Sequence, residues 1–383
     1  MILELTRVSV LKTKIVIYGA GAIGRGFLPW IISDKYHEII FIDKNEELID
    51  NLNSQKFYTS YLVKNNVYEK KNIFIDEAYL PEKFDLSGHK DVIACFLADG
   101  PRNVIEACKK FKDSNIPLIL CENDYNTKSI VKAEVGYQSV YFAVPDVITS
   151  NTAPQSLLDL DRLSIVSESG ILYTEVNLKN LYSDAVVIEE EDLYKRQWIP
   201  KLYLHNTPHC IAAYLGAYFG KKYIHEVMAD EALAKIVEGA MNEMLEALIL
   251  ENDVDQDFLT WYADKELSRF RCKLLFDPVT RVAREPLRKL ELDGRLIGAV
   301  QICFSKKVTP NFLILGVITA LLYNDFNDPD AHIEMMYQSL GLEHFNKYIL
   351  GLRTGEPLDL ILRERGAEFI EMLLDMKSIL NVQ

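Results

Sequence analysis

A short apolar strand that runs directly into a glycine-rich turn constrains the fold of this chain more than any other feature. The strand covers residues 14–18, and the turn after it has glycine at 19, 21 and 24, in the spacing Gly-x-Gly-x-x-Gly. Apolar residues at 28, 31 and 32 then continue with helical spacing. Strand, turn and helix in this order predict the first unit of a parallel α/β sheet.

Each glycine of the turn has its own physical role. Gly19 permits the tight turn, Gly21 lets a pyrophosphate approach the backbone, and Gly24 lets the helix pack closely on the strand. Ala22 and Ile23 begin the helix, whose N-terminus attracts phosphate oxygens. We therefore predict that these residues bind the phosphates of a dinucleotide; a glycine turn with only a structural role is the alternative.

The next predicted strand, residues 39–43, ends in an acid at the distance that a dinucleotide site requires. Asp43 lies nineteen residues after Gly24. A carboxylate at this place can bind the adenosine ribose hydroxyls and repel a 2′-phosphate, so NAD is favoured over NADP. Lys44, the next residue, weakens that preference. The combined pattern predicts NAD as the cofactor.

Further strand patterns extend the predicted sheet. We expect an inserted β-hairpin over residues 57–75, and strands at 91–97, 116–120, 140–144, 163–167, 171–176 and 185–188. Ligands bind beyond the carboxyl ends of the strands in such sheets. Gly100, Asn123 and Thr149 follow three of the strands and are candidates to contact cofactor or substrate. For Asn123 an ordinary turn or cap role is an equal alternative.

The composition changes near the acidic run at residues 189–192. Beyond it, apolar residues recur at intervals of three and four over residues 211–219, 227–249, 258–270, 312–323 and 358–380. We predict an NAD-binding, Rossmann-type doubly wound α/β domain over residues 1–194 and an all-α domain over residues 195–383. The active site is expected in the cleft between them.

Charge and composition exclude several classes of function. The 383 residues carry a net charge of −14 without a run rich in Lys or Arg, which argues against nucleic acid or an anionic membrane as partner. The longest apolar stretch, residues 312–323, is too short to cross a bilayer, and the six cysteines include no Cys-x-x-Cys pair. We expect a reduced, soluble, cytoplasmic protein, a monomer or small homo-oligomer, that acts on a small molecule.

The stretch Lys201–His209 (Lys-Leu-Tyr-Leu-His-Asn-Thr-Pro-His) concentrates groups that suit proton transfer. A lysine that loses its charge by burial can act as a base near neutral pH. Asn206 and His209 beside it can hold an oxygen that alternates between alcohol and carbonyl. The alternative is that a surface lysine, a capping asparagine and a core histidine are neighbours without a common role.

Helix geometry alone does not bring these three side chains together. In an unbroken α-helix His209 projects about 80° and Asn206 about 140° from Lys201. Pro208 inside a helix would remove one backbone hydrogen bond and kink the chain. It fits better as the first residue of a new helix that Thr207 caps.

A basic cluster stands out in the otherwise acidic second half. Its members are Arg281, Arg284, Arg288 and Lys289. The three arginines have the spacing i, i+3 and i+7, which is one face if the segment is helical, and they could bind a substrate phosphate or carboxylate. A surface turn paired with Glu285 and Glu291 is the alternative. Because no His or Cys grouping has zinc-ligand spacing, we predict a metal-independent reaction.

Together these motifs resemble the polyol-specific long-chain dehydrogenases, the mannitol dehydrogenase family. The likeness covers nearly the whole chain, and its specific parts are the Lys-x4-Asn-x2-His and Arg-x-Pro-Leu-Arg-Lys-Leu patterns. The residues that carry it are Gly19–Phe27, Gly100-Pro101, Cys121–Asn123, Lys201 with Asn206 and His209, residues 212–216 and residues 281–290.

The resemblance implies a metal-independent, reversible oxidation of a polyol to a ketose with NAD. It implies that Lys201 is the general acid/base, that Asn206 and His209 hold the reacting oxygen, and that Asn123 lies near the reaction centre. The chain length resembles that of the sugar-phosphate branch, which implies mannitol 1-phosphate and fructose 6-phosphate as reactants. The basic cluster would then hold the phosphate.

The chain departs from the family pattern in two places. The family usually has Val-Asp-Arg-Ile where this chain has Ile-Thr-Ser-Asn at residues 148–151, so an acid and an arginine are missing, and Asp146 is offset by three residues. Pro208 replaces the glycine before His209. A hydroxyacid dehydrogenase similar to ketopantoate reductases, and a non-catalytic NAD-binding sensor, remain as alternatives.

Overall fold

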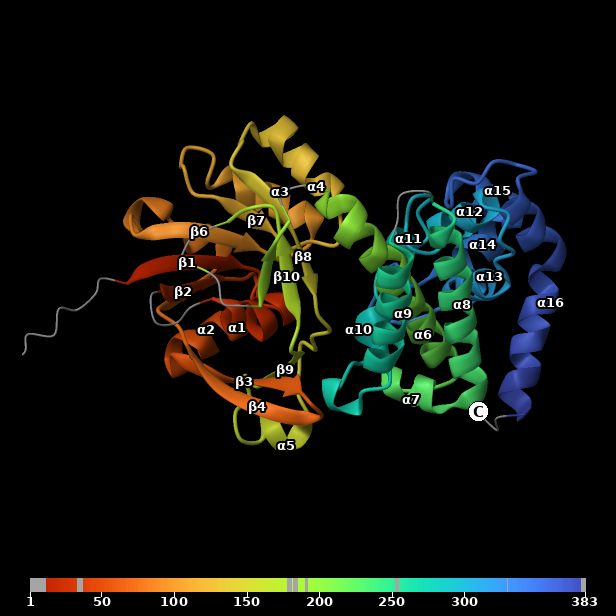
Figure 1. The fold of residues 1–383 in the computed structure, drawn as a ribbon, viewed down its shortest axis with the longest axis horizontal. Coiled ribbons are helices and arrows are strands. Elements are labelled where there is room, and N and C mark those ends of the chain that lie inside the picture. The colour runs from red at the N-terminus through yellow and green to blue at the C-terminus, as the bar shows by residue number, and fades with distance from the viewer. Residues whose placement is uncertain are drawn as a thin grey trace, which may run out of the picture. The chain divides into compact units, whose positions relative to one another are not determined.

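The computed structural model describes residues 12–32, 37–177, 181, 185–189, 192–251, 255–328 and 330–379. By its contacts the chain divides into two compact units, residues 1–198 with 274–276, and residues 199–273 with 277–383 (Figure 1). The acidic run at the predicted boundary lies partly outside the described residues, since 190 and 191 are not among them.

A mainly parallel sheet forms the centre of the first unit. Its strands are β1 (Thr13–Tyr18), β2 (His37–Ile42), β5 (Glu77–Tyr79), β6 (Val92–Leu97), β7 (Leu118–Leu120), β8 (Val140–Asp146), β10 (Ile171–Thr174) and β11 (Val186–Ile188). In the described residues their order is β11-β10-β8-β7-β6-β1-β2-β5, and β10 runs antiparallel to β8. The predicted doubly wound α/β domain is confirmed.

The central strand β1 is buried because the sheet is covered on both faces. Ile15, Val16 and Ile17 are fully buried, as a continuous apolar strand of a parallel sheet requires. β2 and β6 pair with opposite edges of β1, so the direction of winding reverses at this strand. The connecting helices include α1 (Leu28–Ile31), α2 (Glu46–Gln55), α3 (Pro101–Lys109), α4 (Asn126–Ile130) and α5 (Gln155–Leu158).

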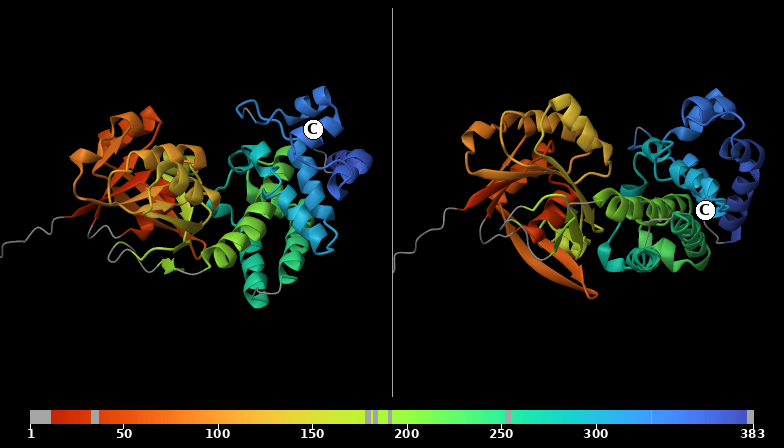
Figure 2. Two further views of the ribbon diagram at one scale, coloured as in Figure 1. Left: turned by 90° about the horizontal axis from the view of Figure 1, so that it is seen from above. Right: turned by 45° about the horizontal axis from the view of Figure 1, so that its top comes forward.

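The predicted hairpin is present and belongs to a separate small sheet (Figure 2). β3 (Phe57–Lys64) pairs antiparallel with β4 (Val67–Phe74), and β3 also pairs parallel with β9 (Ile165–Glu168). Asn65 and Asn66 form the hairpin turn with φ of 51° and 60°, a conformation that asparagine tolerates better than most residues. The sequence does not predict the pairing of β9 with the hairpin.

The described residues of the second unit form helices, as predicted. They are α6 (Thr207–Tyr218), α7 (Ile224–Ala229), α8 (Glu231–Ile249), α9 (Gln256–Phe270), α10 (Val279–Ala283), α11 (Pro286–Lys289), α12 (Ile297–Ser305), α13 (Asn311–Leu321), α14 (Ile333–Leu340), α15 (Leu342–Tyr348) and α16 (Pro357–Ile379). The predicted helix over 227–249 is two helices, because Asp230 caps α8 by accepting the Ala232 and Leu233 N–H groups. Leu380, the predicted end of the last helix, lies outside the described residues.

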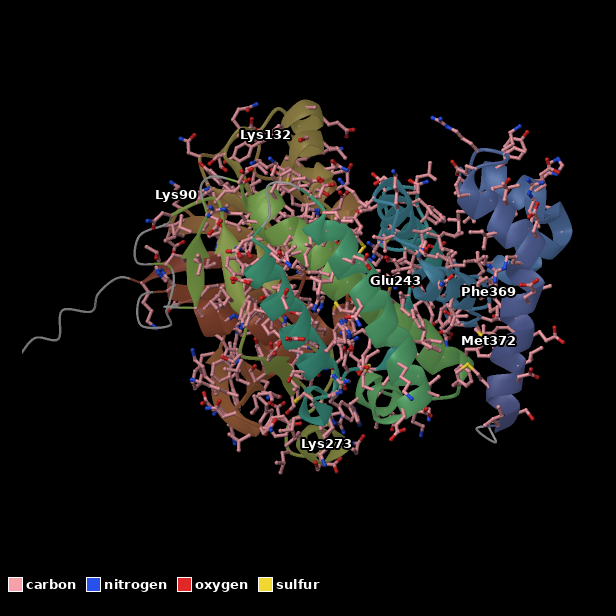
Figure 3. All side chains as sticks on the ribbon, turned by 45° about the vertical axis from the view of Figure 1, so that its right-hand side comes forward. Lys90, Lys132, Glu243, Lys273, Phe369 and Met372 are labelled. Carbon is pink, nitrogen blue, oxygen red and sulfur yellow. The ribbon has the colours of Figure 1, made fainter. Side chains whose placement is uncertain are left out.

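Helix α6 is the core of the second unit. It packs against α7, α8, α10 and α13, and its first ten residues are buried. Gly316 of α13 permits one of these contacts, since a Cβ there would lie 2.5 Å from Ile211 Cγ1. Glu243 on α8, labelled in Figure 3, accepts the Phe312 and Leu313 N–H groups and so caps α13.

Two further features bear on the class of protein. Among the described residues, no helix is both long enough and apolar enough to span a bilayer. All six cysteines are free thiols. Cys272 is partly exposed, and the other five are buried.

Candidate active site

The glycine turn lies where the winding of the parallel sheet reverses. Gly19 has φ of 98°, which favours glycine, and its N–H donates to Ile42 O at the end of β2 (2.8 Å). A Cβ on Gly19 would lie only 2.4 Å from Ala98 O, beyond the end of β6. The turn therefore joins the carboxyl ends of three neighbouring strands, the usual ligand position in such a sheet.

The other two glycines differ in their surroundings. A Cβ on Gly24 would lie 1.8 Å from Gly19 O, so the backbone at Gly24 packs directly on the carbonyl of Gly19. Beside Gly21 the space is open, because a Cβ there would meet no atom of the described residues within 4 Å. Ala22 and Ile23 begin η1 (Ala22–Phe27), a π-helical turn, and both are half-buried. The turn can thus receive a phosphate group beside Gly21.

Asp43, directly after β2, is bound to the glycine turn. Its Oδ2 accepts the Ala20 N–H (2.8 Å) and its Oδ1 accepts the Asn45 N–H (2.9 Å). A carboxylate has about four acceptor sites, so these bonds fix its position and leave sites for the hydroxyls of a ligand. Nζ of the exposed Lys44 lies 3.9 Å from Asp99 Oδ1. The negative charge of Asp99 therefore offsets part of the positive charge of Lys44.

Arg25 is a residue of this region that the sequence interpretation missed. Its buried side chain donates from Nε to Ala20 O (2.7 Å) and from Nη1 to Leu163 O (2.9 Å). The Tyr58 hydroxyl donates to Arg25 O (2.7 Å). Ala20 is therefore held at its N–H by Asp43 and at its carbonyl by Arg25. The position of Arg25 directly after the last glycine of the motif is the one sequence signal that points to its role.

The other candidates of the first unit follow β6, β7 and β8. Gly100 has φ of 88° at the start of α3, and its N–H donates to Glu122 Oε1 (3.0 Å). Asn123 is exposed in the loop after β7. Thr149 is buried and forms an isolated antiparallel bridge with Ser167 of β9. Gly100 and Asn123 thus lie near the carboxyl ends of their strands, whereas Thr149 joins the small sheet.

Lys201, Asn206 and His209 lie on one continuous helical segment of the second unit. Lys201 and Asn206 are the first and last residues of η6 (Lys201–Asn206), a π-helical turn, and His209 lies in the first turn of α6. π-Helical hydrogen bonds join residues five apart, so Asn206 lies one turn above Lys201 instead of about 140° away from it. Asn206 and His209 are three residues apart, which makes them neighbours at the junction with the α-helix.

Pro208 explains why the turn is wide. Proline has no N–H, and in an α-helix its ring collides with the carbonyl four residues earlier, that of Leu204. Here the Thr207 N–H donates to Leu202 O, five residues back, so the helix widens ahead of Pro208 and is not interrupted. The prediction that Thr207 caps a new helix is therefore wrong: α6 already begins at Thr207, whose hydroxyl donates to Arg295 O (2.5 Å) and lies 3.1 Å from Leu202 O.

The three side chains are buried, and one of them has a free donor. Lys201, Asn206 and His209 are 6%, 6% and 7% exposed. Within the described part of the chain, Asn206 Nδ2 is buried without a hydrogen-bond partner. A buried donor in this state costs about 1–3 kcal/mol unless a ligand accepts its hydrogen bond. Asn206 is therefore a candidate to contact a bound oxygen.

His209 is held by a buried carboxylate. Its Nε2 lies 2.7 Å from Asp277 Oδ2, and Asp277 Oδ1 accepts Nε (3.0 Å) and Nη2 (2.5 Å) of Arg281. Burial lowers the pKa of His209. For Asp277 burial acts against ionisation, but Arg281 and His209 outweigh it and lower the pKa to about 2. A neutral imidazole therefore faces a charged carboxylate that Arg281 balances; no local pattern in the sequence reveals Asp277.

The basic segment 281–289 is not one helical face. Arg284 and Glu285 separate α10 from α11, and Glu285 has a left-handed backbone with φ of 56°. The spacing i, i+3 and i+7 brings the three arginines to one face only in an unbroken helix, which this segment does not form. Arg284 itself is exposed.

Several charges of this segment are bound within the protein. Arg281 binds Asp277, and Arg288 Nε donates to Glu285 Oε2 (2.7 Å) at the surface. Lys289 is buried and donates to two backbone carbonyls of the preceding segment. Burial lowers the pKa of Lys289 well below its ordinary value. The structure therefore does not gather the cluster into one open anion site.

Two family models match the chain. The mannitol dehydrogenase Rossmann domain matches residues 13–76, and the mannitol dehydrogenase C-terminal domain matches residues 197–341. The chain belongs to the mannitol dehydrogenase family. The glycine turn and Asp43 lie in the first matched range, and Lys201–His209 with the basic segment lie in the second. No group of three or more His, Cys, Asp or Glu side chains among the described residues is placed to hold a metal ion.

Two curated relatives and one solved structure align over most of the chain. Mannitol-1-phosphate 5-dehydrogenase of Caldanaerobacter subterraneus subsp. tengcongensis is 28% identical over 368 residues, with 90% of this chain and 95% of the relative covered. That of Thermoanaerobacter pseudethanolicus is 28% identical over 375 residues, with the same coverage. The solved structure of Pseudomonas fluorescens mannitol 2-dehydrogenase, a ternary complex with NAD and D-mannitol, has a TM-score of 0.73 at 16% identity, covering 95% and 94% of the two chains. The fold is therefore shared with that structure.

Proposed function

We propose that this member of the mannitol dehydrogenase family is an NAD-dependent oxidoreductase that interconverts a polyol phosphate and a ketose phosphate, most simply mannitol 1-phosphate and fructose 6-phosphate. The observation that carries the proposal is the buried group Lys201, Asn206 and His209, in which Asn206 Nδ2 has no partner among the described residues. The curated relatives are mannitol-1-phosphate 5-dehydrogenases that align with 90% of this chain, and they support the substrate class.

The residues of the first unit fit NAD. The open space beside Gly21 and the start of η1 suit a pyrophosphate, and the fixed carboxylate of Asp43 suits the adenosine ribose. Gly100 and Asn123, beyond the ends of β6 and β7, would lie toward the nicotinamide half. When bound, NAD supplies the acceptor for the hydride that leaves the carbinol carbon. We propose that the two units act on one substrate.

In this mechanism Lys201 removes the hydroxyl proton during oxidation and returns it during reduction. Asn206 donates its Nδ2–H to the same oxygen as negative charge develops there, which satisfies the buried donor. Asp277 accepts the Nε2–H of His209, and this assignment of the tautomer leaves Nδ1 as an acceptor for a substrate hydroxyl. His209 therefore orients the alcohol, whereas Asn206 stabilises the alkoxide.

An assay that follows NADH absorbance tests the proposal. The panel contains mannitol 1-phosphate, other hexitol and pentitol phosphates, free mannitol, a uronate and a 2-oxo acid, because the substituted loop at residues 148–151 bears on the choice of polyol. We expect turnover with a polyol phosphate to exceed turnover with the free polyol. Preferred reduction of the 2-oxo acid would instead indicate a hydroxyacid dehydrogenase, and NAD binding without any turnover would indicate a sensor.

A further inference from the structure

Another buried histidine–carboxylate pair lies inside the π-helical turn, and the proposed mechanism does not use it. His205, 4% exposed, places Nδ1 2.5 Å from Glu266 Oε2 on α9. Glu266 is fully buried, and its other oxygen lies 2.5 Å from Arg269 Nη1. We call His205, Glu266 and Arg269 the His205 clamp, because they join the turn to α9.

The Glu266 carboxylate has cationic partners other than His205. The Glu266 carboxylate and the Arg269 guanidinium neutralise each other, and Lys265 Nζ lies 3.4 Å from the carboxylate at a partly exposed position. Burial lowers the pKa of His205 to about 4, so its imidazole is neutral at neutral pH. His205 therefore contributes one directed hydrogen bond, which suits a residue that fixes geometry.

Aromatic packing joins the clamp to His209. The ring centroids of His205 and His209 are 5.1 Å apart in an edge-on arrangement, and the His209 ring stacks on Phe270 at 4.9 Å. Phe270 also contacts the His205 ring, at 5.7 Å. The end of α9 thus supplies the carboxylate that binds His205 and the ring that supports both histidines.

The two histidines are anchored in the same way from different segments. His205 binds Glu266, which binds Arg269, and His209 binds Asp277, which binds an arginine four residues further on. A π-helical turn is seen as a local insertion in an α-helix, often at functional sites. Pro208, just after the turn, disfavours an α-helical conformation of this segment. An anchor on His205, within the turn, would hold the π-helical conformation.

We propose that the His205 clamp is a positioning device that holds this segment in its π-helical register and so keeps Asn206 one turn above Lys201. The inference rests on the proposed function only for the catalytic roles of these two residues. If the turn relaxes to an α-helix, the Thr207 N–H moves from Leu202 O to Tyr203 O. Asn206 then turns away from Lys201 by about 100°, the rotation of one α-helical residue.

Substitution of His205 tests the clamp with little disturbance of charge. His205→Leu removes the neutral hydrogen bond and leaves the Glu266–Arg269 ion pair in place. We expect kcat for the polyol phosphate to fall about 100-fold, as a misplaced catalytic group can cause. The Kd for NAD, read from protein fluorescence, should stay within about twofold, since the nucleotide turn lies in the other unit. A crystal structure should show the Thr207 N–H bonded to Tyr203 O.

Two further variants separate positioning from general stability. In His205→Asn, the side-chain Nδ2 takes the place of the imidazole Nδ1 and can still donate to Glu266, so kcat should return to within about threefold of the original. His225→Leu is the matched control, because His225 lies in the same unit on α7, with its ring stacked on Tyr223 at 5.5 Å. It should leave kcat and the register of η6 unchanged.

The proposal is overturned if His205→Leu keeps full turnover, or if its crystal structure retains the bond from Thr207 N–H to Leu202 O. Should that variant not fold, Glu266→Asp provides the same measurements, because it withdraws the carboxylate from His205 by one methylene and keeps a charge for Arg269. A wild-type protein without activity on any polyol phosphate would overturn the proposed function. In that case the crystal structures of the variants still test the clamp, because they show whether the Thr207 N–H bonds to Leu202 O or to Tyr203 O.

Discussion

Each unit has a π-helical turn at its proposed ligand site, but the two turns are held in different ways. In the first unit η1 begins directly after Gly21, where the backbone of Gly24 packs on the carbonyl of Gly19 and the Tyr58 hydroxyl adds one hydrogen bond to Arg25 O. In the second unit η6 ends two residues ahead of Pro208, and we propose that Glu266 of α9 holds it through His205. A turn held by backbone contacts should respond to changes in volume, whereas one held by buried polar side chains should respond to changes in hydrogen bonding and pH.

The largest effect is expected from Lys201→Ala. Removal of a general acid/base lowers turnover about 10²–10⁴-fold. NAD binding should persist, because the glycine turn and Asp43 belong to the other unit. Steady-state NADH production and an NAD titration by fluorescence measure both quantities. A Lys201→Ala protein with full activity would remove Lys201 from the mechanism.

Paired glycine substitutions test whether backbone contacts hold the first turn. Gly24→Ala places a Cβ against Gly19 O, so we expect the free energy of unfolding to fall by about 3 kcal/mol, with loss of NAD binding. Gly21→Ala meets open space and should fold normally, but its methyl group occupies room for the pyrophosphate and should weaken NAD binding about tenfold. Thermal denaturation with an NAD titration compares the two. Equal losses of stability would contradict the distinction between the glycines.

The pH dependence of stability tests the side-chain anchors of the second turn. The folded-state pKa of His205 is about 4, below the ordinary value of 6.5, so its contribution is present above pH 6.5 and is lost as the pH falls toward 4. The loss is about 3 kcal/mol for a shift of this size. Unfolding in urea at several pH values should show a shallower decline for His205→Leu than for the wild type. Parallel curves would contradict a buried neutral His205.

The smallest effect is expected at the basic segment. Arg288 already binds Glu285 at the surface, so Arg288→Ala should cost little stability. If Arg288 also contacts the substrate phosphate, its loss should raise KM for a phosphorylated substrate several-fold more than KM for the unphosphorylated analogue. Steady-state kinetics with both substrates decides this. Equal effects on the two KM values would exclude the phosphate contact.

Much of the fold could be predicted because its signals are local. The apolar run before Gly19, the strand pattern over residues 57–75 and the apolar repeat of about 3.6 residues in the second half are local signals, and the structure confirms the elements that they predict. The short strand β5 and the pairing of β9 with the hairpin were not predicted. Strand pairing depends on contacts between distant segments, and three residues such as those of β5 carry no clear period.

The candidate site also has parts that local sequence signals predict and parts that they do not. Spacing alone placed Asn206 far around an α-helix from Lys201, and the likeness to a family, not geometry, suggested their common role. The catalytic and binding roles of the named residues stay predictions. Nothing in the local pattern marks His205, because its partner Glu266 lies 61 residues further along the chain.

By itself the sequence determined the parts that depend on backbone constraints: the glycine turn, the strand before it, the acid after β2, and the proline that cannot continue an ordinary α-helix. Only the tertiary structure decided which side chains hold the second turn. Glu266 and Asp277 reach His205 and His209 from segments more than sixty residues away, and burial then sets the ionisation of each group. Backbone constraints act between neighbours in the chain, but burial and hydrogen-bond partners exist only once distant segments have packed together.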